Sequence, residues 1–210
     1  AYGRCGVTIH RKNPNIVMAV VQTDKTPIGP QGQAPKESDD ASLGGVFRSN
    51  DAGKTWKKLN DLVPRPFYYG KIRFDPANDQ RVYVLGVRLH VSPDGGSTFV
   101  ERQPPNVHLD HHALWINPKD SDHLILGNDG GLYVSKDRGR PFEMKRGLSI
   151  GQFYGIAADT RTPYRVVGGL QDNGSWMGPS ATPYPDGIGV SDWNRVAGAD
   201  GFQCAFDWKD

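Results

Sequence analysis

The residues best suited to chemistry stand together in the stretch His-Leu-Asp-His-His at 108–112. Imidazole and carboxylate groups can ligate a divalent metal ion, and they can also act as general acid and general base. If the stretch is a β-strand, its alternate residues His108, Asp110 and His112 share one face. Three interpretations are open: a metal site, a catalytic pair, and a hydrogen-bonded cluster that contacts a ligand or fixes the strand. We favour the third.

Two later segments carry similar side chains. Asn128 and Asp129 stand in Gly-Asn-Asp-Gly-Gly (127–131), which is typical of a tight turn and only loosely similar to a calcium or phosphate loop. The run Gln-Asp-Asn at 171–173 also suits a turn, but turn chemistry alone does not account for all three residues, so ligand contact stays open as an alternative. No cofactor is expected, and a divalent cation at 108–112 is kept as a hypothesis.

The elements that must position these residues follow from a repeat. The pattern Ser-x-Asp-x-Gly begins at Ser49, Ser92 and Ser135, so consecutive copies are 43 residues apart. Upstream of the second and third copies, a short apolar segment, a turn with proline and a second apolar segment recur, at 72–86 and 114–131. Four short antiparallel strands in such a length are typical of a β-propeller blade. The sequence predicts an all-β propeller of four-stranded antiparallel blades, with a β-sandwich as the alternative.

The repeats predict about four and a fraction blades in one propeller segment, 1–210. Closed propellers have about four to eight blades, so this is a partial ring whose remaining blades come from missing sequence or another chain. A polar segment rich in proline and glycine, 23–42, is predicted to be a flexible insertion. The expected blades span about 2–63, 67–104, 107–147 and 151–196, with the start of a fifth at 197–210.

The repeated turn has a structural explanation. Its Asp can accept backbone N–H groups, its Gly can adopt positive φ, and its closing aromatic residue can pack inward between blades. In the third copy Pro141 replaces the threonine, so one hydrogen bond is lost there. The residues with this structural role are Ser49, Asp51, Gly53, Trp56, Ser92, Asp94, Gly96, Phe99, Ser135, Asp137, Gly139 and Phe142.

The turn pattern resembles the Asp-box of bacterial neuraminidase-type repeats. Segments such as Gly-Gly-Leu-Gln-Asp-Asn-Gly-Ser-Trp (168–176) are similar to sortilin-type propellers of large secreted bacterial proteins, and the resemblance covers nearly the whole chain. It implies a propeller whose turns lie on the outer rim, and an extracytoplasmic location, periplasmic or secreted. Its members include sialidases, xyloglucan-type glycoside hydrolases, sorting receptors and photosystem assembly factors, so it leaves the activity open.

Candidate ligand contacts follow from the propeller geometry. Loops between blades and loops joining the second and third strands of a blade emerge at the mouth of the channel, where we expect the ligand. The candidates in these loops are Arg4, Tyr68, Tyr69, His108, Asp110, His111, Tyr154, Gln171, Asp172, Asn173 and Asp200, with His112, Asn128, Asp129 and Gln152 beside them.

The favoured function is a non-catalytic binding or scaffold module for a protein or a glycan. The alternative is a glycoside hydrolase of xyloglucanase or sialidase type, which usually needs two carboxylates about 5–9.5 Å apart. By the same resemblance a sialidase needs three arginines, and only Arg4 falls in the predicted mouth. A docking platform in an assembly is a third hypothesis, suited by Tyr68 and Tyr69. The catalytic candidates are Asp110, Asp129, Asp172 and Asp200.

Composition excludes some partners. The chain has 25 basic and 23 acidic residues, which gives no footprint for nucleic acid or an acidic membrane surface. Cys5 and Cys204 are too few for a disulfide framework and are expected to be buried free thiols. No apolar run approaches the roughly 18 residues of a membrane span, and no signal peptide opens the sequence.

Overall fold

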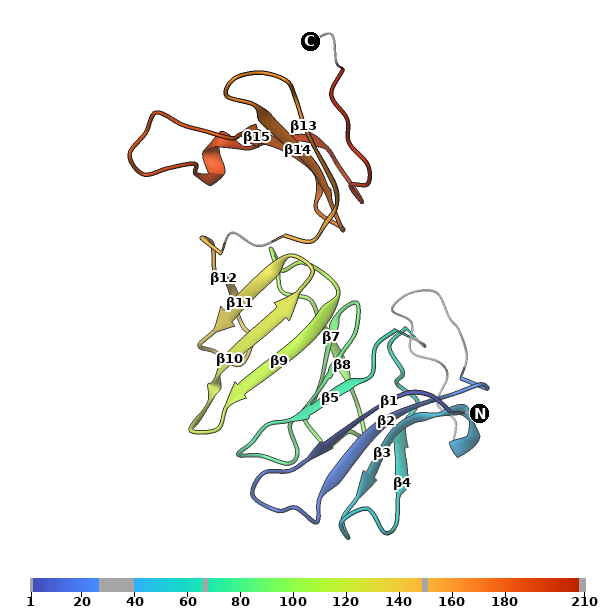
Figure 1. The fold of residues 1–210 in the computed structure, drawn as a ribbon. Helices are drawn as coiled ribbons and strands as arrows, with labels where there is room; N and C mark the ends of the chain where they lie inside the picture. The colour runs from blue at the N-terminus through green and yellow to red at the C-terminus, as the bar shows by residue number, and fades with distance from the viewer. Residues whose placement is uncertain (1, 27–39, 66–67, 149–150, 208–210) are drawn as a thin grey trace. The chain divides into compact units, whose positions relative to one another are not determined.

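The computed structural model describes residues 2–26, 40–65, 68–148 and 151–207. These residues form four antiparallel sheets of four strands each, with two short 3-10 helices, Ala41–Leu43 and Val190–Asp192 (Figure 1). The prediction of an all-β partial propeller is confirmed. Most of the predicted insertion 23–42 lies outside the described residues. Among the described residues, neither helix has the length or apolar character of a membrane span.

Each sheet is a meander in which every strand pairs with the next one along the chain. The first sheet contains β1 (Tyr2–Ile9), β2 (Val17–Thr23), β3 (Gly45–Ser49) and β4 (Lys57–Asn60). The second contains β5 (Lys71–Phe74), β6 (Val82–Leu85), β7 (Leu89–Ser92) and β8 (Val100–Arg102). The third contains β9 (His111–Asn117), β10 (Asp120–Asn128), β11 (Gly131–Ser135) and β12 (Glu143–Met144). The fourth contains β13 (Phe153–Ala158), β14 (Arg165–Leu170), β15 (Gly174–Pro179) and β16 (Asn194–Ala197).

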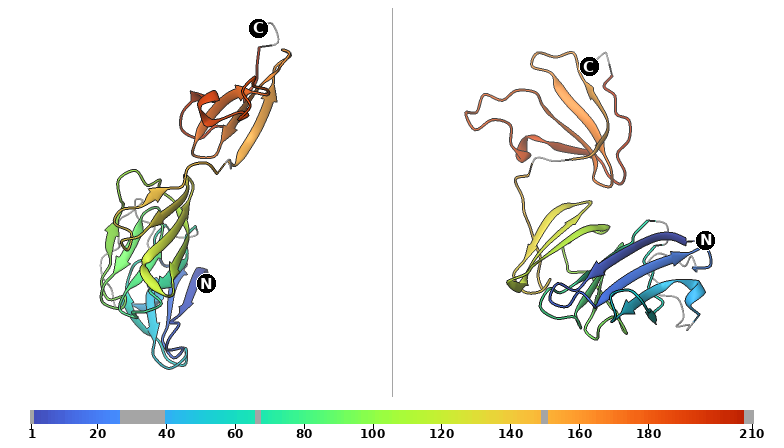
Figure 2. Two further views of the ribbon diagram at one scale, coloured as in Figure 1. Left: turned by 90° about the vertical axis from the view of Figure 1, so that its left-hand side faces the viewer. Right: turned by 60° about the horizontal axis from the view of Figure 1, so that its bottom comes forward.

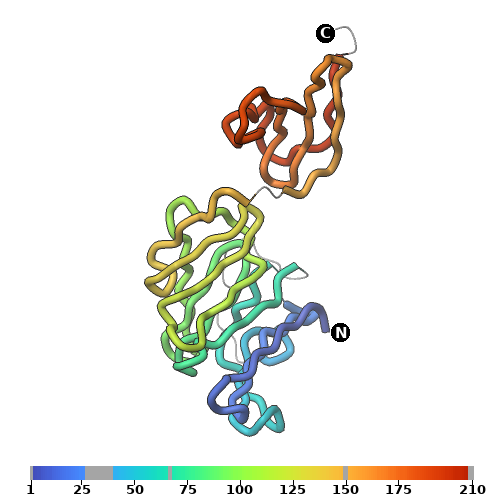
Figure 3. The backbone as a smooth tube through the Cα atoms, turned by 60° about the vertical axis from the view of Figure 1, so that its left-hand side comes forward, coloured from blue at the N-terminus to red at the C-terminus, as the bar shows by residue number. Residues whose placement is uncertain are grey.

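The chain divides into two compact units, Ala1–Arg146 and Gly147–Asp210. The first unit holds the first three sheets, and the second unit holds the fourth. Within the first unit the sheets follow one another in chain order, from the blue strands through the green to the yellow (Figures 2 and 3).

Two apolar clusters hold the first unit together. Its inner strands are short runs of branched and aromatic residues, such as Val-Tyr-Val-Leu in β6, which is buried along its whole length. Burying one such side chain stabilises the fold by roughly 1.5–3 kcal/mol. The cluster between the first and second sheets contains Met18, Val20, Val46, Leu62, Val63, Ile72, Phe74, Val82 and Val84. The cluster between the second and third contains Tyr83, Leu85, Leu89, Val91, Val107, Leu114, Ile116, Leu124, Leu126, Tyr133 and Phe142.

The repeated turn joins the third and fourth strands of a sheet. Ser49 Oγ accepts the N–H groups of Asp51 (3.3 Å) and Gly53 (2.9 Å) and donates to Asp51 Oδ1 (2.7 Å). The Asp51 carboxylate accepts the N–H (2.9 Å) and the hydroxyl (2.5 Å) of Thr55. Gly53 has a φ of 86°, as the turn requires. The second copy repeats these contacts with Ser92, Asp94, Gly96 and Thr98.

The third copy is weaker, as the sequence predicts. Ser135 Oγ accepts the N–H groups of Asp137 (3.1 Å) and Gly139 (2.9 Å). Pro141 has neither a backbone N–H nor a hydroxyl to offer the carboxylate of Asp137. That carboxylate lies 3.7 Å from a guanidinium nitrogen of Arg140 instead.

These turns lie at the end of each sheet that also carries the turn between its first and second strands. In the first two sheets the backbone N–H just before the turn glycine donates to a carbonyl of that neighbouring turn, and in the third sheet it donates to a carbonyl near the start of β10. The pairs are Ala52 to Asn15 (2.9 Å), Gly95 to Gln80 (2.7 Å) and Arg138 to Asp122 (3.0 Å). The loops predicted to form the mouth emerge at the opposite end of the sheets, because the strands are antiparallel.

The aromatic residues that close the three repeated turns differ in their burial. Phe142 is buried in the second cluster, and Phe99 packs against the first cluster while partly exposed. Trp56 is 43% exposed, so the prediction that it packs inward is wrong. Its indole Nε1–H donates to the carbonyl of Gly53 (2.9 Å), which holds the ring over its own turn.

In the second unit, the segment after β16 packs on the fourth sheet. The N–H of Gly201 donates to the carbonyl of Leu170 (2.9 Å), and the ring of Phe202 stacks on Tyr154 at a centroid distance of 5.2 Å. Residues 201–207 are not assigned to a strand, and 208–210 lie outside the described residues. The start of a fifth blade therefore stays a prediction.

The two cysteines are free thiols. Cys5 is exposed and Cys204 is half-buried, so the expectation of buried thiols is wrong for Cys5.

Candidate ligand-binding site

The stretch 108–112 is not one continuous strand. β9 begins at His111, and Asp110 has a φ of 64°, in the left-handed region that non-glycine residues seldom occupy. The alternation that would place His108, Asp110 and His112 on one face is therefore wrong. A turn before the strand replaces it, and its N–H groups at Asp110 and His111 donate to carbonyls of the β6–β7 turn (both 2.9 Å).

The turn aims Asp110 at a tyrosine on the preceding sheet. The hydroxyl of Tyr69, in the β4–β5 loop, donates to Asp110 Oδ1. Tyr69 is only 3% exposed, and burial together with this carboxylate raises its pKa well above the ordinary value of 10. The phenol therefore stays protonated and serves as a permanent donor to Asp110.

Tyr68, the preceding residue, is exposed and contacts two arginines. The guanidinium of Arg65 lies 4.4 Å from the centroid of the Tyr68 ring, a cation–π contact. Arg4 of β1 donates to the backbone carbonyl of Tyr68. The ring of Tyr68 also meets Tyr69 edge-on, at a centroid distance of 4.9 Å. Tyr68 is thus fixed from both sides while 37% of its surface remains open.

The third sheet contributes a histidine and a carboxylate to the same place. His112 Nε2 lies 3.1 Å from Asp129 Oδ1, in the β10–β11 turn. Its ring approaches Tyr69 (5.4 Å) and Tyr68 (5.9 Å) between centroids. We call Arg4, Arg65, Tyr68, Tyr69, Asp110, His112 and Asp129 the mouth cluster.

His111, next to His112 of the mouth cluster, is held by Asn128 and Gln103. Asn128 donates its side-chain N–H to the carbonyl of His108 (2.8 Å) and accepts the N–H of Gly130 on its oxygen (3.0 Å), which fixes the amide orientation. The same nitrogen lies 3.5 Å from His111 Nδ1, so this ring atom is the acceptor and Nε2 carries the hydrogen. Nε2 faces the side-chain oxygen of Gln103 at 3.3 Å.

This environment keeps His111 neutral. Its ring is fully buried, and burial lowers its pKa from 6.5 to about 4. His108, by contrast, turns its Nδ1 to the carbonyl of Leu109 (3.1 Å). Among the described residues, no three histidine, cysteine, aspartate or glutamate side chains gather closely enough to hold a metal ion. The side chains of His108, Asp110 and His112 accordingly have separate protein partners.

The second unit holds the other predicted contacts, and Asp200, which follows β16, contacts the β14–β15 turn there. Asp200 Oδ1 accepts the backbone N–H of Asp172 (2.8 Å), whose φ is 58°. Asn173 donates to the carbonyl of Gln171 (2.9 Å), and its own carbonyl accepts the indole N–H of Trp176 (2.8 Å). Much of the Gln-Asp-Asn run is therefore explained by loop geometry, as a turn that Asp200 fastens. Gln152 and Tyr154 are exposed in the same unit.

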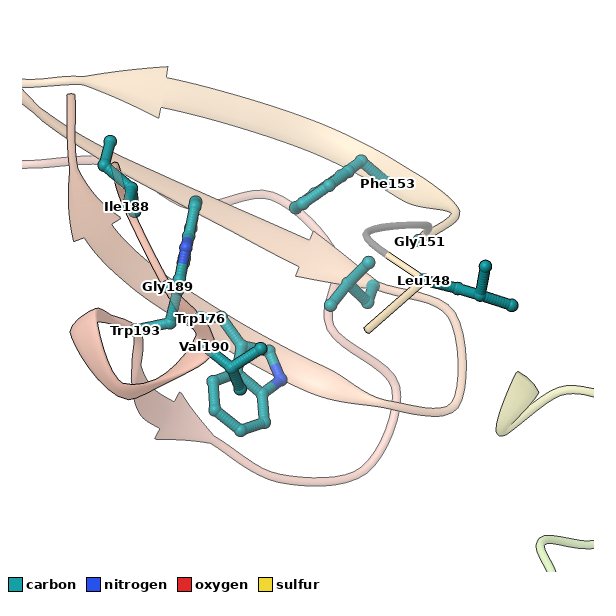
Figure 4. Close-up of a pocket in the computed structure, with 9 residues that line it drawn as sticks. Leu148, Gly151, Phe153, Trp176, Ile188, Gly189, Val190 and Trp193 are labelled. Carbon is teal, nitrogen blue, oxygen red and sulfur yellow. The ribbon is translucent and has the colours of Figure 1, made fainter. Parts of the chain in front are cut away.

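The second unit also contains a pocket that was not predicted. An open pocket of about 420 Å³ lies against one face of the fourth sheet (Figure 4). None of the predicted contact residues lines it. Its signal in the sequence is the cluster of tryptophan and aliphatic residues at 188–193, within the long β15–β16 connection. The lining residues are Leu148, Gly151, Phe153, Leu170, Trp176, Ile188, Gly189, Val190 and Trp193.

Sequence reasoning also missed two residues of the mouth. Arg65 precedes the two tyrosines in the same predicted loop, so its position was a usable signal. Gln103 has no such signal, because its contact with His111 depends on how the β8–β9 loop folds.

Comparison with known proteins identifies a family whose model matches this chain. The family model Sortilin-Vps10, described as "Sortilin, neurotensin receptor 3", matches residues 44–158. The chain is 28% identical over 116 residues to the VPS10 domain-containing receptor SorCS1 and 28% identical over 127 residues to SorCS3, both from Homo sapiens. The matches cover 52% and 55% of this chain. The chain spans about a tenth of the length of these curated relatives.

Solved structures show the same fold in more distant proteins. A GH74 enzyme from Niastella koreensis aligns with a TM-score of 0.52 and 12% identity, covering 93% of this chain and 30% of its own. A GH74 xyloglucanase from Xanthomonas campestris aligns with a TM-score of 0.52 and 13% identity, covering 86% of this chain and 31% of its own. At this identity the likeness shows the fold alone.

Proposed function

The chain belongs to the Sortilin-Vps10 family, and from this we propose that it is a non-catalytic propeller module that binds a protein ligand through the mouth cluster. The relatives named as receptors support a protein rather than a glycan as the ligand. We further propose an extracytoplasmic location, and we keep the Asp-box resemblance of the three repeated turns.

The observation that carries the proposal is that three of the four candidate carboxylates already have protein partners. Asp110 accepts the hydroxyl of Tyr69, Asp129 pairs with His112, and Asp200 accepts a backbone N–H in the second unit. A hydrolase needs one carboxylate ready to protonate the leaving group and another ready to attack or to activate water. Carboxylates that are hydrogen-bonded within the protein suit a rigid binding surface better than a hydrolase site.

The exposed part of the cluster has the composition of an interface centre. Tyrosine and arginine are enriched where binding energy concentrates, because they combine large contact area with directed hydrogen bonds. Tyr68 offers an open ring, and the exposed residue Arg65 places its guanidinium over that ring. Because the ring and the guanidinium are already positioned, a ligand loses less free energy in ordering them.

A peptide selection tests the proposal. A random peptide library displayed on phage is selected against the immobilised chain, and enriched peptides are titrated against the chain and against Tyr68→Ala. We expect enriched peptides whose affinity falls at least about tenfold in Tyr68→Ala, as for a central interface aromatic. Val100→Ala, an exposed position on β8, is the matched control and should leave the affinity unchanged.

The glycoside hydrolase alternative is tested in parallel. The chain is incubated with xyloglucan, and new reducing ends are counted. Turnover that is abolished by Asp110→Asn or Asp200→Asn would overturn the non-catalytic proposal. Peptides whose binding is indifferent to Tyr68 would overturn the assignment of the mouth cluster instead.

A further inference from the structure

The first strand of the first sheet has an extra residue near the mouth. The register of β1 and β2 shifts between Tyr2 and Cys5, so that Gly3 and Arg4 oppose the single residue Gln22. Two residues opposite one form a β-bulge, which bends the strand and re-aims a side chain, often beside a functional site. Because Arg4 belongs to the mouth cluster, the bulge lies where the direction of a side chain matters for binding.

Gln22 completes the bulge with a hydrogen bond. It is completely buried, and its side-chain oxygen accepts the backbone N–H of Arg4 (3.2 Å). A bulge disrupts the ladder of backbone hydrogen bonds, and here a side-chain amide supplies the acceptor. The preceding residues of β2, 17–21, are all apolar. A polar side chain at the next buried position is therefore explained by this hydrogen bond and not by core packing.

Two glycines make room for this arrangement. A Cβ on Gly3 would lie 2.6 Å from Cδ of Gln22, which is too close for two carbon atoms. A Cβ on Gly70 would lie 2.8 Å from Cγ of Arg4, so the stem of the arginine crosses this glycine. Beyond it, the guanidinium donates to the backbone carbonyl of Tyr68. The bulge, the amide and the two glycines together direct Arg4 onto the loop that carries Tyr68.

The third sheet contains the same arrangement near the mouth. The register of β9 and β10 shifts so that His111 and His112 oppose the single residue Asn128. The residue opposite the bulge is again an amide, and its side-chain nitrogen donates to the carbonyl of His108, just before the bulge (2.8 Å). The bulge again contains a member of the mouth cluster, His112. Two sheets of the first unit thus combine a bulge, an amide opposite it and a mouth residue within it.

The fourth sheet separates the bulge from the amide. Phe153 and Tyr154 of β13 oppose the single residue Leu170, so a bulge forms there with an aliphatic side chain opposite it. In the second sheet, β5 and β6 pair without a shift. An amide is therefore not a requirement of the bulge itself. In the first and third sheets it makes hydrogen bonds to the bulged strand or to the residues just before it, which restrict the direction of the bulge.

We propose that Gln22 is a positioning residue of the mouth cluster, which holds the bulge of β1 in the form that directs the guanidinium of Arg4 to Tyr68 and to the ligand. A guanidinium is a donor only, so the ligand group that it selects is an oxygen acceptor such as a carbonyl or a carboxylate. Holding the arginine in one direction lowers the entropy lost on binding. The effect of Gln22 on the ligand rests on the proposed function, whereas its effect on Arg4 does not.

Side-chain relaxation tests the positioning of Arg4 without a ligand. The NMR order parameter of its Nε–H bond is measured in the full chain and in Gln22→Met, which keeps the length of the side chain and removes the amide. We expect an ordered Arg4 in the unaltered chain and an order parameter below about 0.6, the range of flexible groups, in the variant. An unchanged order parameter would overturn the proposal.

Arg65 is the reference in the same spectra. Its guanidinium contacts the ring of Tyr68 without a bond to β1 or β2, so its Nε–H should keep its order parameter in Gln22→Met. A fall at both arginines would mean that the variant loosens the whole mouth, which contradicts a specific role of Gln22.

A second variant keeps the test valid if Gln22→Met does not fold. Gly3→Ala places a methyl group against the amide of Gln22 from an exposed position on the edge strand β1. It should release Arg4 to the same extent. Val7→Ala, an exposed position on the same strand outside the bulge, is the matched control and should leave Arg4 ordered. Equal order in Gly3→Ala and Val7→Ala would count against the proposal.

A double-mutant cycle connects the positioning to binding. Peptides enriched on the unaltered chain are titrated against Arg4→Ala, Gln22→Met and the double variant. Each single variant should lose about tenfold in affinity, and the double variant should lose no more than Arg4→Ala. Losses that multiply in the double variant would show that Gln22 acts on the mouth by a route other than Arg4, and the proposal would be wrong.

The role of Gln22 and the proposed function fail in different ways. A selection that enriches no peptide overturns the proposed function, and the order parameter of Arg4 then decides the positioning role alone. Enriched peptides that depend on Tyr68 but bind Arg4→Ala with unchanged affinity overturn the role of Gln22 in ligand binding, while the proposed function stands.

Discussion

The repeated turns and the mouth cluster are built from the same residue types but in different ways. In the turns, the side chains of Ser49 and Asp51 bond to residues within four positions along the chain. In the mouth, Tyr69 reaches Asp110 across 41 positions, and Arg4 reaches the carbonyl of Tyr68 across 64. Bonds that close locally can be copied in every repeat, whereas bonds that cross between sheets are made once. A uniform scaffold can thus carry a site whose parts differ from sheet to sheet.

The two regions also differ in their response to acid. Hydrogen bonds from Thr55 and Ser49 lower the pKa of Asp51 to about 2, so the first turn keeps its carboxylate ionised in mild acid. Burial lowers the pKa of His111 to about 4, so the support of the mouth depends on a neutral imidazole. The mouth should therefore respond to acid before the turns do.

The largest effect is expected at a turn glycine that meets the core. Gly96 has a φ of 101°, and a Cβ there would lie 2.3 Å from Cε of Met18, which is fully buried. Gly96→Ala should lower the free energy of unfolding by about 3 kcal/mol, from left-handed strain plus repacking. Gly53→Ala has only the strain, since its nearest neighbour, Trp56, is 3.6 Å away, and it should cost about 1 kcal/mol. Urea unfolding measures both; equal losses would show that the turn makes no contact with the core.

Acidification should act next, through His111. A histidine whose pKa is lower in the folded state stabilises the fold above its unfolded pKa of 6.5, and this stability is lost as the pH falls toward 4. The loss should be on the order of 2–3 kcal/mol by pH 4. The charged or titratable groups around the ring are His90, His108, Asp110 and His112.

Urea unfolding of the chain and of His111→Gln at pH 7 and pH 4.5 measures this term. The glutamine cannot take up a proton, so the variant should lose less stability between the two pH values. His90 is also buried, and burial lowers its pKa, so His90→Gln serves as the control for a histidine outside the mouth. If the unaltered chain and His111→Gln lose the same free energy of unfolding between pH 7 and pH 4.5, His111 does not set the acid response.

Serine replacement separates a complete turn from an incomplete one. Ser92 is fully buried and makes three hydrogen bonds within its turn, so Ser92→Ala should cost about 2 kcal/mol. Ser135 accepts two hydrogen bonds in a turn where Pro141 replaces the threonine, so Ser135→Ala should cost about 1 kcal/mol. Thermal unfolding of the two variants ranks them. If Ser135→Ala lost more stability than Ser92→Ala, the threonine contacts of the complete turn would not strengthen the hydrogen bonds of its serine.

The same contrast explains what the sequence could and could not predict. The turn hydrogen bonds, the glycine φ and the defect at Pro141 follow from a few adjacent residues, and the structure contains all three. The register of four strands follows from the spacing of the repeat. The side-chain directions at 108–110 do not, because Asp110 leaves the extended conformation to bond with the β6–β7 turn of another sheet. The prediction for Trp56 is wrong although its bond is local, because the indole N–H donates to the carbonyl of Gly53 and the sequence does not rank this bond against burial of the ring.

A small change in stability and the clearest change in function are expected at Tyr69. Tyr69→Phe removes the donor to Asp110 and keeps the buried ring. Because Asp110 is only half-buried, water can replace the lost bond, and the free energy of unfolding should fall by only about 1 kcal/mol. Affinity for peptides selected on the mouth cluster should fall further, about tenfold, since the carboxylate of Asp110 loses its fixed position.

Ser92→Ala is the matched comparison for this variant, because it costs more stability far from the mouth. At a temperature where both variants are fully folded, Ser92→Ala should bind the selected peptides like the unaltered chain. A Tyr69→Phe variant that binds normally would show that the mouth cluster only stabilises the contact between sheets. Its role would then be structural, like that of the repeated turns within each sheet. Weaker binding in Tyr69→Phe alone would show that the cross-sheet bonds hold the binding surface and the local ones hold the scaffold.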